Sequence, residues 1–371
     1  MTQKYSIQTP AFFLGLLCLI IFAASCGKKE DAAPVATPIG KIGLYEYQSG
    51  LNKRIFIPIT PVGATPTKST VTLPLYAIFD TGSTGLTLDA DGLIPASMIT
   101  STGITVTGDS VVVNGITITK QTATVSFGDA TASTKEYGNL AYATFTFGEV
   151  GSSQVTTSRI PFFLYYKVVN QNNVPYSAHS ADVFGVGSGV SYASSKIASP
   201  LSYFTSTTGA TSGFKLSTMT TAGFNSTGTF VKDLLTIGLI PSDLTSAGFV
   251  MHPLSYFTVG GYSDNIPATI TYNGTVVSSA QILFDTGTPS VSVIEDPKAT
   301  GIGALAANSV VSVTTNKGFT FQYIVGSSGN LTSIQNPNNT QDYRSIFSLD
   351  FFINNEYLVD YKNHQIGLKN N

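Results

Sequence analysis

The feature that most constrains this chain is a short phrase that occurs twice. Residues 79–83 read Phe-Asp-Thr-Gly-Ser, and residues 284–288 read Phe-Asp-Thr-Gly-Thr. Each copy follows an apolar run and precedes alternating apolar and polar positions. A single Asp-Thr-Gly is most often a turn, because Asp and Gly both suit tight turns. The second copy, with the same flanks, reverses that interpretation, and the 205 residues between the two aspartates leave room for one small β-rich lobe per copy.

The two segments resemble the paired active-site loops of pepsin-like aspartic peptidases. The resemblance implies that each lobe supplies one loop and that Asp80 and Asp285 meet at the lobe junction as a catalytic pair. Two carboxyl groups about 3 Å apart share one proton, because both cannot stay ionised. One carboxylate then activates a water molecule while the protonated partner polarises the substrate carbonyl. This chemistry needs no metal and no cofactor, and its substrate is a peptide or protein.

The residues that flank the two aspartates have supporting roles in this interpretation. Glycine lets backbone N–H groups approach a carboxylate closely, and Ser or Thr hydroxyls can hydrogen-bond its outer oxygens. The resemblance further implies that the two loop threonines bond across the lobe junction. We therefore expect the following residues to support the pair: Thr81, Gly82, Ser83, Thr286, Gly287 and Thr288.

Composition agrees with an all-β chain that has two lobes. Only 11% of the residues are charged, against about 25% in typical domains, and 35 are Gly. Turn signals are frequent, and Asn-Gly at 114–115 lies between two apolar runs, which predicts a hairpin. We expect an N-terminal lobe over residues 42–190 and a C-terminal lobe over residues 191–371. The net charge of −2 and the lack of a basic patch argue against a nucleic-acid partner, and we expect a monomer.

A long predicted hairpin follows the first loop, where the pepsin-like family places the flap that closes over substrate. The family usually carries Tyr-Gly at the flap tip, whereas this chain has Phe127-Gly128 there. Tyr137 is a second candidate for the flap tyrosine. A plain surface hairpin is the alternative interpretation of this region.

Two further segments resemble strands that pack beneath the loops in this family. Residues 181–189 contain the apolar-apolar-Gly pattern expected below the first loop, with Gly185 as its glycine. Residues 346–368 resemble the closing strands of the second lobe, but Ser348 stands where the family normally has Gly. A serine side chain must fit beneath the second loop, so we expect the packing there to differ from the family's.

The N-terminus predicts a targeting segment. Residues 11–22 form an apolar run of about a dozen residues, too short to span a bilayer, which needs about 20. The small residues before Cys26 resemble the lipobox of a bacterial lipoprotein, in which this cysteine is lipidated and becomes the first mature residue. We therefore expect a signal peptide over 1–25, a tether over 26–41 and a lipid anchor in the cell envelope, at the outer membrane and with possible surface exposure. An ordinary signal peptide that happens to end near a cysteine is the alternative.

The combined expectation is a membrane-anchored aspartic endopeptidase. One rival is a non-catalytic binding module that keeps the pepsin-like scaffold, favoured by Ser348 and by the phenylalanine at the flap position. A second rival is a surface adhesin or glycan-binding β-protein, suggested by the Ser-, Thr- and Gly-rich lipoprotein character; two aspartates far apart would favour it. The three histidines show no metal-binding spacing and are interpreted as surface or loop residues.

Overall fold

The computed structural model describes residues 35–63, 75–128, 133–204 and 209–371. The expected signal peptide, Cys26 and residues 27–34 of the expected tether lie outside the described residues. Residues Ala36–Asn371 form one compact unit. No helix within the described ranges is long and apolar enough to cross a membrane.

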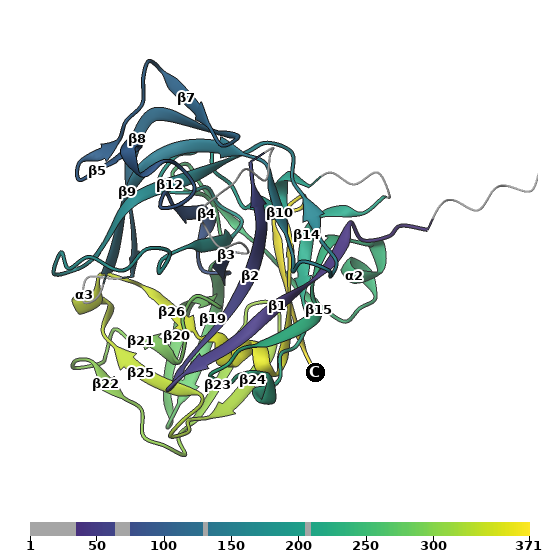
Figure 1. Cartoon of the computed structure of the whole chain (residues 1–371). Helices are drawn as coiled ribbons and strands as arrows, with labels where there is room; N and C mark the ends of the chain where they lie inside the picture. The colour runs from purple at the N-terminus through teal and green to yellow at the C-terminus, as the bar shows by residue number, and fades with distance from the viewer. Residues whose placement is uncertain (1–34, 64–74, 129–132, 205–208) are drawn as a thin grey trace, which may run out of the picture. The chain divides into compact units, whose positions relative to one another are not determined.

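The larger sheet runs through both halves of the chain (Figure 1). Over the described residues it contains 16 strands, in the order β16-β28-β27-β14-β15-β1-β2-β3-β13-β4-β12-β9-β8-β7, with β10 and β11 beside β2. Their bounds are β1 (Gly40–Ser49), β2 (Asn52–Val62), β3 (Leu75–Asp80), β4 (Thr84–Asp89), β7 (Ser110–Val113), β8 (Ile116–Gly128), β9 (Ser133–Ala143), β10 (Phe145–Phe147), β11 (Val155–Thr156), β12 (Ile160–Asn170), β13 (Val183–Val186), β14 (Thr211–Leu216), β15 (Thr229–Leu239), β16 (Val250–Pro253), β27 (Asn355–Asp360) and β28 (Gln365–Asn370).

The second sheet belongs to the C-terminal half and has the order β22-β25-β21-β26-β20-β19-β23-β24. Its strands are β19 (Ile266–Tyr272), β20 (Thr275–Phe284), β21 (Val291–Glu295), β22 (Gly303–Ala304), β23 (Val310–Thr315), β24 (Thr320–Ile324), β25 (Leu331–Gln335) and β26 (Arg344–Phe347). Two small hairpins, β5 (Ile99–Thr100) with β6 (Gly103–Ile104) and β17 (Ser255–Phe257) with β18 (Gly261–Ser263), stand apart. The described helices are short: α2 (Pro241–Thr245), α3 (Pro337–Thr340) and the 3-10 helices η1 (Ala96–Met98), η2 (Pro200–Tyr203), η3 (Thr221–Gly223) and η4 (Leu349–Ile353).

The repeated phrase marks a repeated topology. In the first half β13 lies between β3 and β4, parallel to β3 and antiparallel to β4. In the second half β26 lies between β20 and β21 in the same two senses. The next strand is parallel in both halves, β12 beside β4 and β25 beside β21. The two loops therefore begin at equivalent positions in two similar lobes. The predicted all-β, two-lobed architecture is confirmed.

Aromatic side chains form the core directly beneath each loop. Phe79 is fully buried and stacks on Phe184 of β13, with ring centroids 6.0 Å apart. Phe284 is equally buried and stacks on Phe351 at 3.9 Å, with Phe347 of β26 at 5.7 Å. Burying such rings contributes about 1.5–3 kcal/mol each. Each loop thus packs on a layer of buried aromatic side chains.

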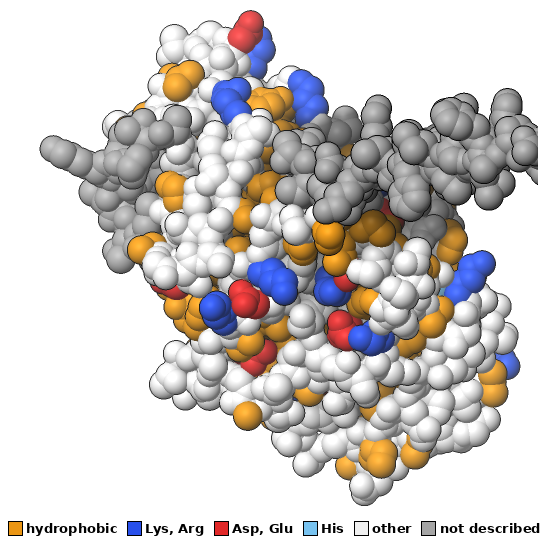
Figure 2. Space-filling model, turned by 90° about the vertical axis from the view of Figure 1, so that its right-hand side faces the viewer, with side chains coloured by type: hydrophobic (Ala, Val, Ile, Leu, Met, Phe, Trp, Pro, Cys, Tyr) orange, Lys and Arg blue, Asp and Glu red, His pale blue; other side chains and the backbone are white. Residues whose placement is uncertain are grey.

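The low charge content is visible on the surface. Figure 2 shows a face on which charged side chains are few and most of the surface is white, which denotes uncharged polar side chains and backbone. The predicted hairpin at Asn114-Gly115 is present between β7 and β8. Both turn residues have positive φ, 51° and 75°, as a type I′ turn requires.

Two sequence interpretations outside the site are wrong. The apolar and polar side chains of residues 257–261 predict one strand, but these residues include the turn of the β17–β18 hairpin, because Gly260 and Gly261 both adopt positive φ. His252 is neither a surface nor a loop residue. It is 1% exposed in β16, and its Nε2 lies 2.8 Å from the Thr315 hydroxyl.

Candidate active site

The two lobes bring both Asp-Thr-Gly loops to one place. Asp80 is the last residue of β3, and Asp285 directly follows β20. Strand β13 pairs Gly185 with Asp80, and the Asp285 N–H donates to the Phe347 carbonyl at 2.9 Å. Each aspartate is thus fixed by the central strand of its own lobe. Asp80 is buried and Asp285 is half-buried.

The two loop threonines lock the loops to each other. The backbone N–H of Thr81 donates to the Thr286 hydroxyl at 3.0 Å, and the N–H of Thr286 donates to the Thr81 hydroxyl at the same distance. The Thr81 hydroxyl donates to the Phe284 carbonyl at 2.7 Å, and the Thr286 hydroxyl donates to the Phe79 carbonyl at 2.6 Å. These four reciprocal bonds are buried, so their loss would leave unsatisfied polar groups at the lobe junction.

Each carboxyl group accepts a matching pair of hydrogen bonds from its own loop. Oδ1 of Asp80 accepts from the Gly82 N–H at 2.7 Å, and Oδ2 accepts from the Ser83 hydroxyl at 2.6 Å. Oδ1 of Asp285 accepts from the Gly287 N–H at 2.7 Å, and Oδ2 accepts from the Thr288 hydroxyl at 2.7 Å. The carboxyl planes are therefore held in place before any ligand arrives.

The glycine of each loop faces the aspartate of the other. A Cβ on Gly82 would lie 2.4 Å from the Asp285 Cγ, and a Cβ on Gly287 would lie 2.6 Å from the Asp80 Oδ1. Only glycine permits so close an approach. Burial, then the charge of Asp285 and a hydrogen bond to its carboxyl, raise the pKa of Asp80 well above its ordinary value. The two acids therefore form one proton-sharing pair.

Ser348 shows why one lobe accepts a side chain where the other needs glycine. In the first lobe, a Cβ on Gly185 would lie 2.8 Å from the Gly85 carbonyl oxygen and 2.8 Å from the Ser83 carbonyl carbon. In the second lobe, Ser348 is fully buried, its N–H donates to the Ser292 hydroxyl at 3.0 Å, and the two hydroxyls lie 3.3 Å apart. The serine is thus accommodated by a hydrogen-bonding partner.

The expected flap is the β8–β9 hairpin. Phe127 and Gly128 are the last residues of β8 and pair with Thr134 and Ser133. The turn between them, residues 129–132, lies outside the described residues. Tyr137 does not lie at the tip. It pairs with Thr124 inside the hairpin, and its ring contacts Lys167, whose Nζ is 5.1 Å from the ring centroid.

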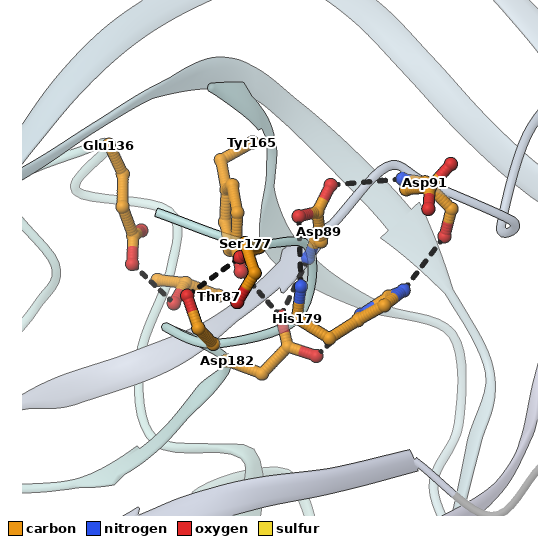
Figure 3. A network of polar contacts seen from close by, with 9 residues as sticks. Thr87, Asp89, Asp91, Glu136, Tyr165, Ser177, His179 and Asp182 are labelled. Carbon is orange, nitrogen blue, oxygen red and sulfur yellow. Dashed lines mark hydrogen bonds and ion pairs between the residues drawn. The ribbon is translucent and has the colours of Figure 1, made fainter. Parts of the chain in front are cut away.

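A largely buried polar network lies around the end of β4 and the start of β13, at the opposite end of these strands from the first loop (Figure 3). Oδ1 of Asp182 accepts from the Asp89 N–H and from the Tyr165 hydroxyl, both at 2.8 Å, and Oδ2 lies 2.9 Å from the His179 Nδ1. The Ile78 N–H donates to the Asp182 carbonyl at 2.9 Å. The hydrogen bond to Asp182 raises the pKa of His179 to about 9, so the imidazole is a cation at neutral pH. The network fixes β13 to β3 and β4, which support Asp80.

Sequence reasoning missed the basic residues that reach the second loop. Lys53 and Arg54 lie in β2, just after the β1–β2 turn. The Lys53 Nζ forms a buried ion pair with the Asp350 Oδ1 at 2.6 Å, and the Arg54 Nη1 donates to the Gly287 carbonyl oxygen. Two adjacent basic residues are unusual in a chain with only 11% charged residues and could have indicated a functional position. The sequence does not show which loop they face.

Within the described part of the chain, no group of three or more His, Cys, Asp or Glu side chains is placed to hold a metal ion. His179 is bound to Asp182 and the Asp91 carbonyl, and the His364 ring stacks on Tyr262 at 3.5 Å. The geometry of the site is that of a paired-carboxyl centre.

Comparisons with known proteins identify the same class of fold. The two lobes, whose loops are hydrogen-bonded to each other, have the pepsin-like aspartic proteinase fold, as the repeated Phe-Asp-Thr-Gly segment predicts. The crystal structure of an aspartic proteinase from Irpex lacteus superposes with a TM-score of 0.55 at 17% identity, over 89% of this chain and 97% of that one. No family model and no curated protein matches the sequence. At this identity the likeness concerns the fold, and the chemistry must be argued from the residues.

Proposed function

We propose that this protein is an aspartic endopeptidase that hydrolyses peptide bonds in the cleft between its lobes. The observation that carries the proposal is that the Asp80 and Asp285 side chains lie next to each other. Each carboxyl group accepts hydrogen bonds from a loop N–H and a loop hydroxyl. Two adjacent carboxyl groups, of which burial and the neighbouring charge raise the pKa of Asp80, suit this hydrolysis. Two acids far apart would have favoured the adhesin or glycan-binding alternative, and this geometry does not favour it.

The proposed mechanism uses only the chain's own carboxyl groups and one water molecule. The ionised carboxylate takes a proton from the water, whose oxygen attacks the carbonyl carbon of the scissile peptide. The protonated carboxyl hydrogen-bonds the carbonyl oxygen, which becomes a hydroxyl of the tetrahedral intermediate. The C–N bond then breaks as one carboxyl group gives its proton to the nitrogen and the other, now ionised, takes the proton from a hydroxyl of the intermediate. The products are a carboxylic acid and an amine, and the pair returns to one shared proton.

The direct test is cleavage of a denatured protein by the purified chain. We expect cleavage at acidic pH, where the pair holds one proton, and inhibition by pepstatin, which occupies paired-aspartate sites. Internal cuts mapped by mass spectrometry would identify an endopeptidase. A broad peptide library left uncut, together with pepstatin binding seen as a rise in Tm, would instead support the non-catalytic binding module that Phe127 favours.

We also propose that Cys26 carries a lipid that anchors the protein at the outer membrane of a bacterial cell. The support is the run of small residues before Cys26, the short apolar segment before them and the Pro- and Ala-rich stretch after them. Cys26→Ala is expected to move the protein from the membrane fraction to the soluble fraction and to abolish labelling by a radioactive fatty acid. Cys18→Ala is the matched control, since this cysteine lies in the segment to be removed. Unchanged fractionation of Cys26→Ala would contradict the anchor.

A further inference from the structure

The β1–β2 hairpin reaches from the large sheet to the second catalytic loop (Figure 1). The Lys53 N–H donates to the Pro289 carbonyl at 3.1 Å, and the Ser290 hydroxyl donates to the Asn52 side-chain oxygen at 3.2 Å. The Lys53–Asp350 ion pair joins the hairpin to η4, whose Leu349 N–H donates to the Thr288 carbonyl at 3.0 Å. The hairpin tip therefore has one defined position on this loop, and the first loop has no comparable contact from it among the described residues.

This placement brings one cation beside the acid pair. The Arg54 guanidinium donates to the Gly287 carbonyl oxygen, inside the loop of Asp285. Burial lowers the pKa of Arg54, while the charges of Asp285 first and Asp80 second raise it. Arginine stays protonated in proteins, so a fixed positive charge faces both acids and interacts more with Asp285.

The other charged groups around the pair are already matched. Arg344 of β26 senses Asp285, but it is held by a bidentate pair with Asp342 at 2.6–3.1 Å. Lys53 is paired with Asp350. Tyr357 of β27 is a neutral phenol whose pKa burial raises far above the working range. Within the described ranges Arg54 forms no ion pair of its own, so the acid pair is its counter-charge.

We propose that Arg54 is a positioning residue that makes the two acids unequal: it holds the negative charge on Asp285 and leaves the shared proton on Asp80. The loops are otherwise closely matched in hydrogen bonding. The deeper burial of Asp80 favours a proton on the same acid, and the Arg54 charge adds to that preference. Asp285 is then the base that activates water, and Asp80 is the acid that faces the substrate carbonyl. The inference rests on the proposed function for these roles, but the protonation pattern stands without it.

The charge also sets the pH range in which the pair holds one proton. A nearby cation favours the ionised form of an acid and lowers its pKa, typically by one to three units. Removing it is therefore expected to move both proton-binding steps of the pair, and both limbs of the pH–rate profile, upward by roughly one pH unit.

Carboxyl ¹³C NMR of aspartate-labelled protein tests this without relying on activity, with signals assigned from Asp80→Asn and Asp285→Asn. In the wild-type protein at the pH where the pair holds one proton, we expect the Asp80 signal at the protonated position and the Asp285 signal at the ionised position. In Arg54→Gln we expect both proton-binding steps of the acid pair to occur at higher pH than in the wild-type protein. In Arg54→Lys, which keeps the charge, we expect both steps to occur near their wild-type pH values. Asn52→Ala, which removes a hairpin contact but no charge, should leave the titration unchanged.

Three results would overturn the inference: a proton on Asp285 in the wild-type protein, an unshifted titration in folded Arg54→Gln, or equal shifts in the Gln and Lys variants. A proton on Asp285 in the wild-type protein overturns the inference even where Arg54→Gln does not fold. A protein that cleaves nothing, yet shows this protonation pattern, would reject the proposed function and retain the role of Arg54.

Discussion

Asp80→Asn and Asp285→Asn are each expected to abolish peptide hydrolysis. Either change removes one of the two groups that exchange the proton, and general acid–base catalysis typically contributes about 10²–10⁴-fold. Since the two acids act as a unit, the double variant should lose no more activity than either single variant. The measurement is kcat/KM on one quenched-fluorescence peptide that the wild-type protein cuts.

The local structure shows why these variants should stay folded. In Asp80→Asn the amide oxygen can keep the Gly82 N–H, and the amide nitrogen can donate to the Ser83 hydroxyl, which is able to accept as well as donate. The raised pKa of Asp80 means that its ionisation costs stability as the pH rises through that value. Asn does not ionise, so Asp80→Asn should be at least as stable as the wild-type protein at pH 7.

Asp109→Asn is the matched control, because this aspartate has an exposed side chain, 88% accessible, whose ion-pair partner is Lys120. It should retain wild-type activity. Full activity in either Asp80→Asn or Asp285→Asn, with the fold intact, would end the proposal of a two-aspartate mechanism.

The part of the fold that the sequence predicted is the part encoded by short, local signals. The Asn-Gly turn needs positive φ, and the glycines of the two Phe-Asp-Thr-Gly segments and Gly185 allow close approaches that a Cβ would block. The secondary structure of the first part of the expected C-terminal lobe was predicted less accurately. Residues 257–261 alternate apolar and polar side chains like a strand, yet two consecutive glycines with positive φ turn the chain there.

The contacts that the sequence did not predict all join distant segments. Arg54 and Gly287 are 233 residues apart, and Lys53 and Asp350 are 297 apart. Which loop a hairpin tip reaches depends on how the two lobes are joined, and no local propensity encodes that. The burial of His252 has the same origin, since its partner Thr315 comes from the other sheet.

The same hairpin has two separable tasks. Arg54 lies beside the acids, where its charge affects proton sharing, whereas Lys53 lies with Asp350 beneath the loop, 5% and 6% exposed. Oδ2 of Asp350 accepts from the Asn330 N–H at 2.6 Å, so this carboxylate fastens η4 and the segment before β25 as well as the hairpin. Stability and chemistry are thus expected to respond to different substitutions one residue apart.

Lys53→Met is accordingly expected to lower the free energy of unfolding by about 3–5 kcal/mol, because it leaves the Asp350 carboxylate buried and unpaired. Adding Asp350→Asn should recover much of that loss, since the amide oxygen can keep the Asn330 hydrogen bond without a buried charge. The loss in the single variant should also shrink as the pH falls and the unpaired carboxyl takes up a proton. Denaturant unfolding of the single and double variants at several pH values measures all three effects.

Lys120→Met provides the comparison, because its ion pair with Asp109 is exposed, with side chains 67% and 88% accessible. Surface pairs contribute about 0–1 kcal/mol, so this variant should change stability little. Equal losses in Lys53→Met and Lys120→Met would show that the ion pair does not join the hairpin to the second loop. A large loss confined to Lys53→Met, reversed by Asp350→Asn, would identify the pair as the contact that keeps the second loop, and with it Asp285, opposite Asp80.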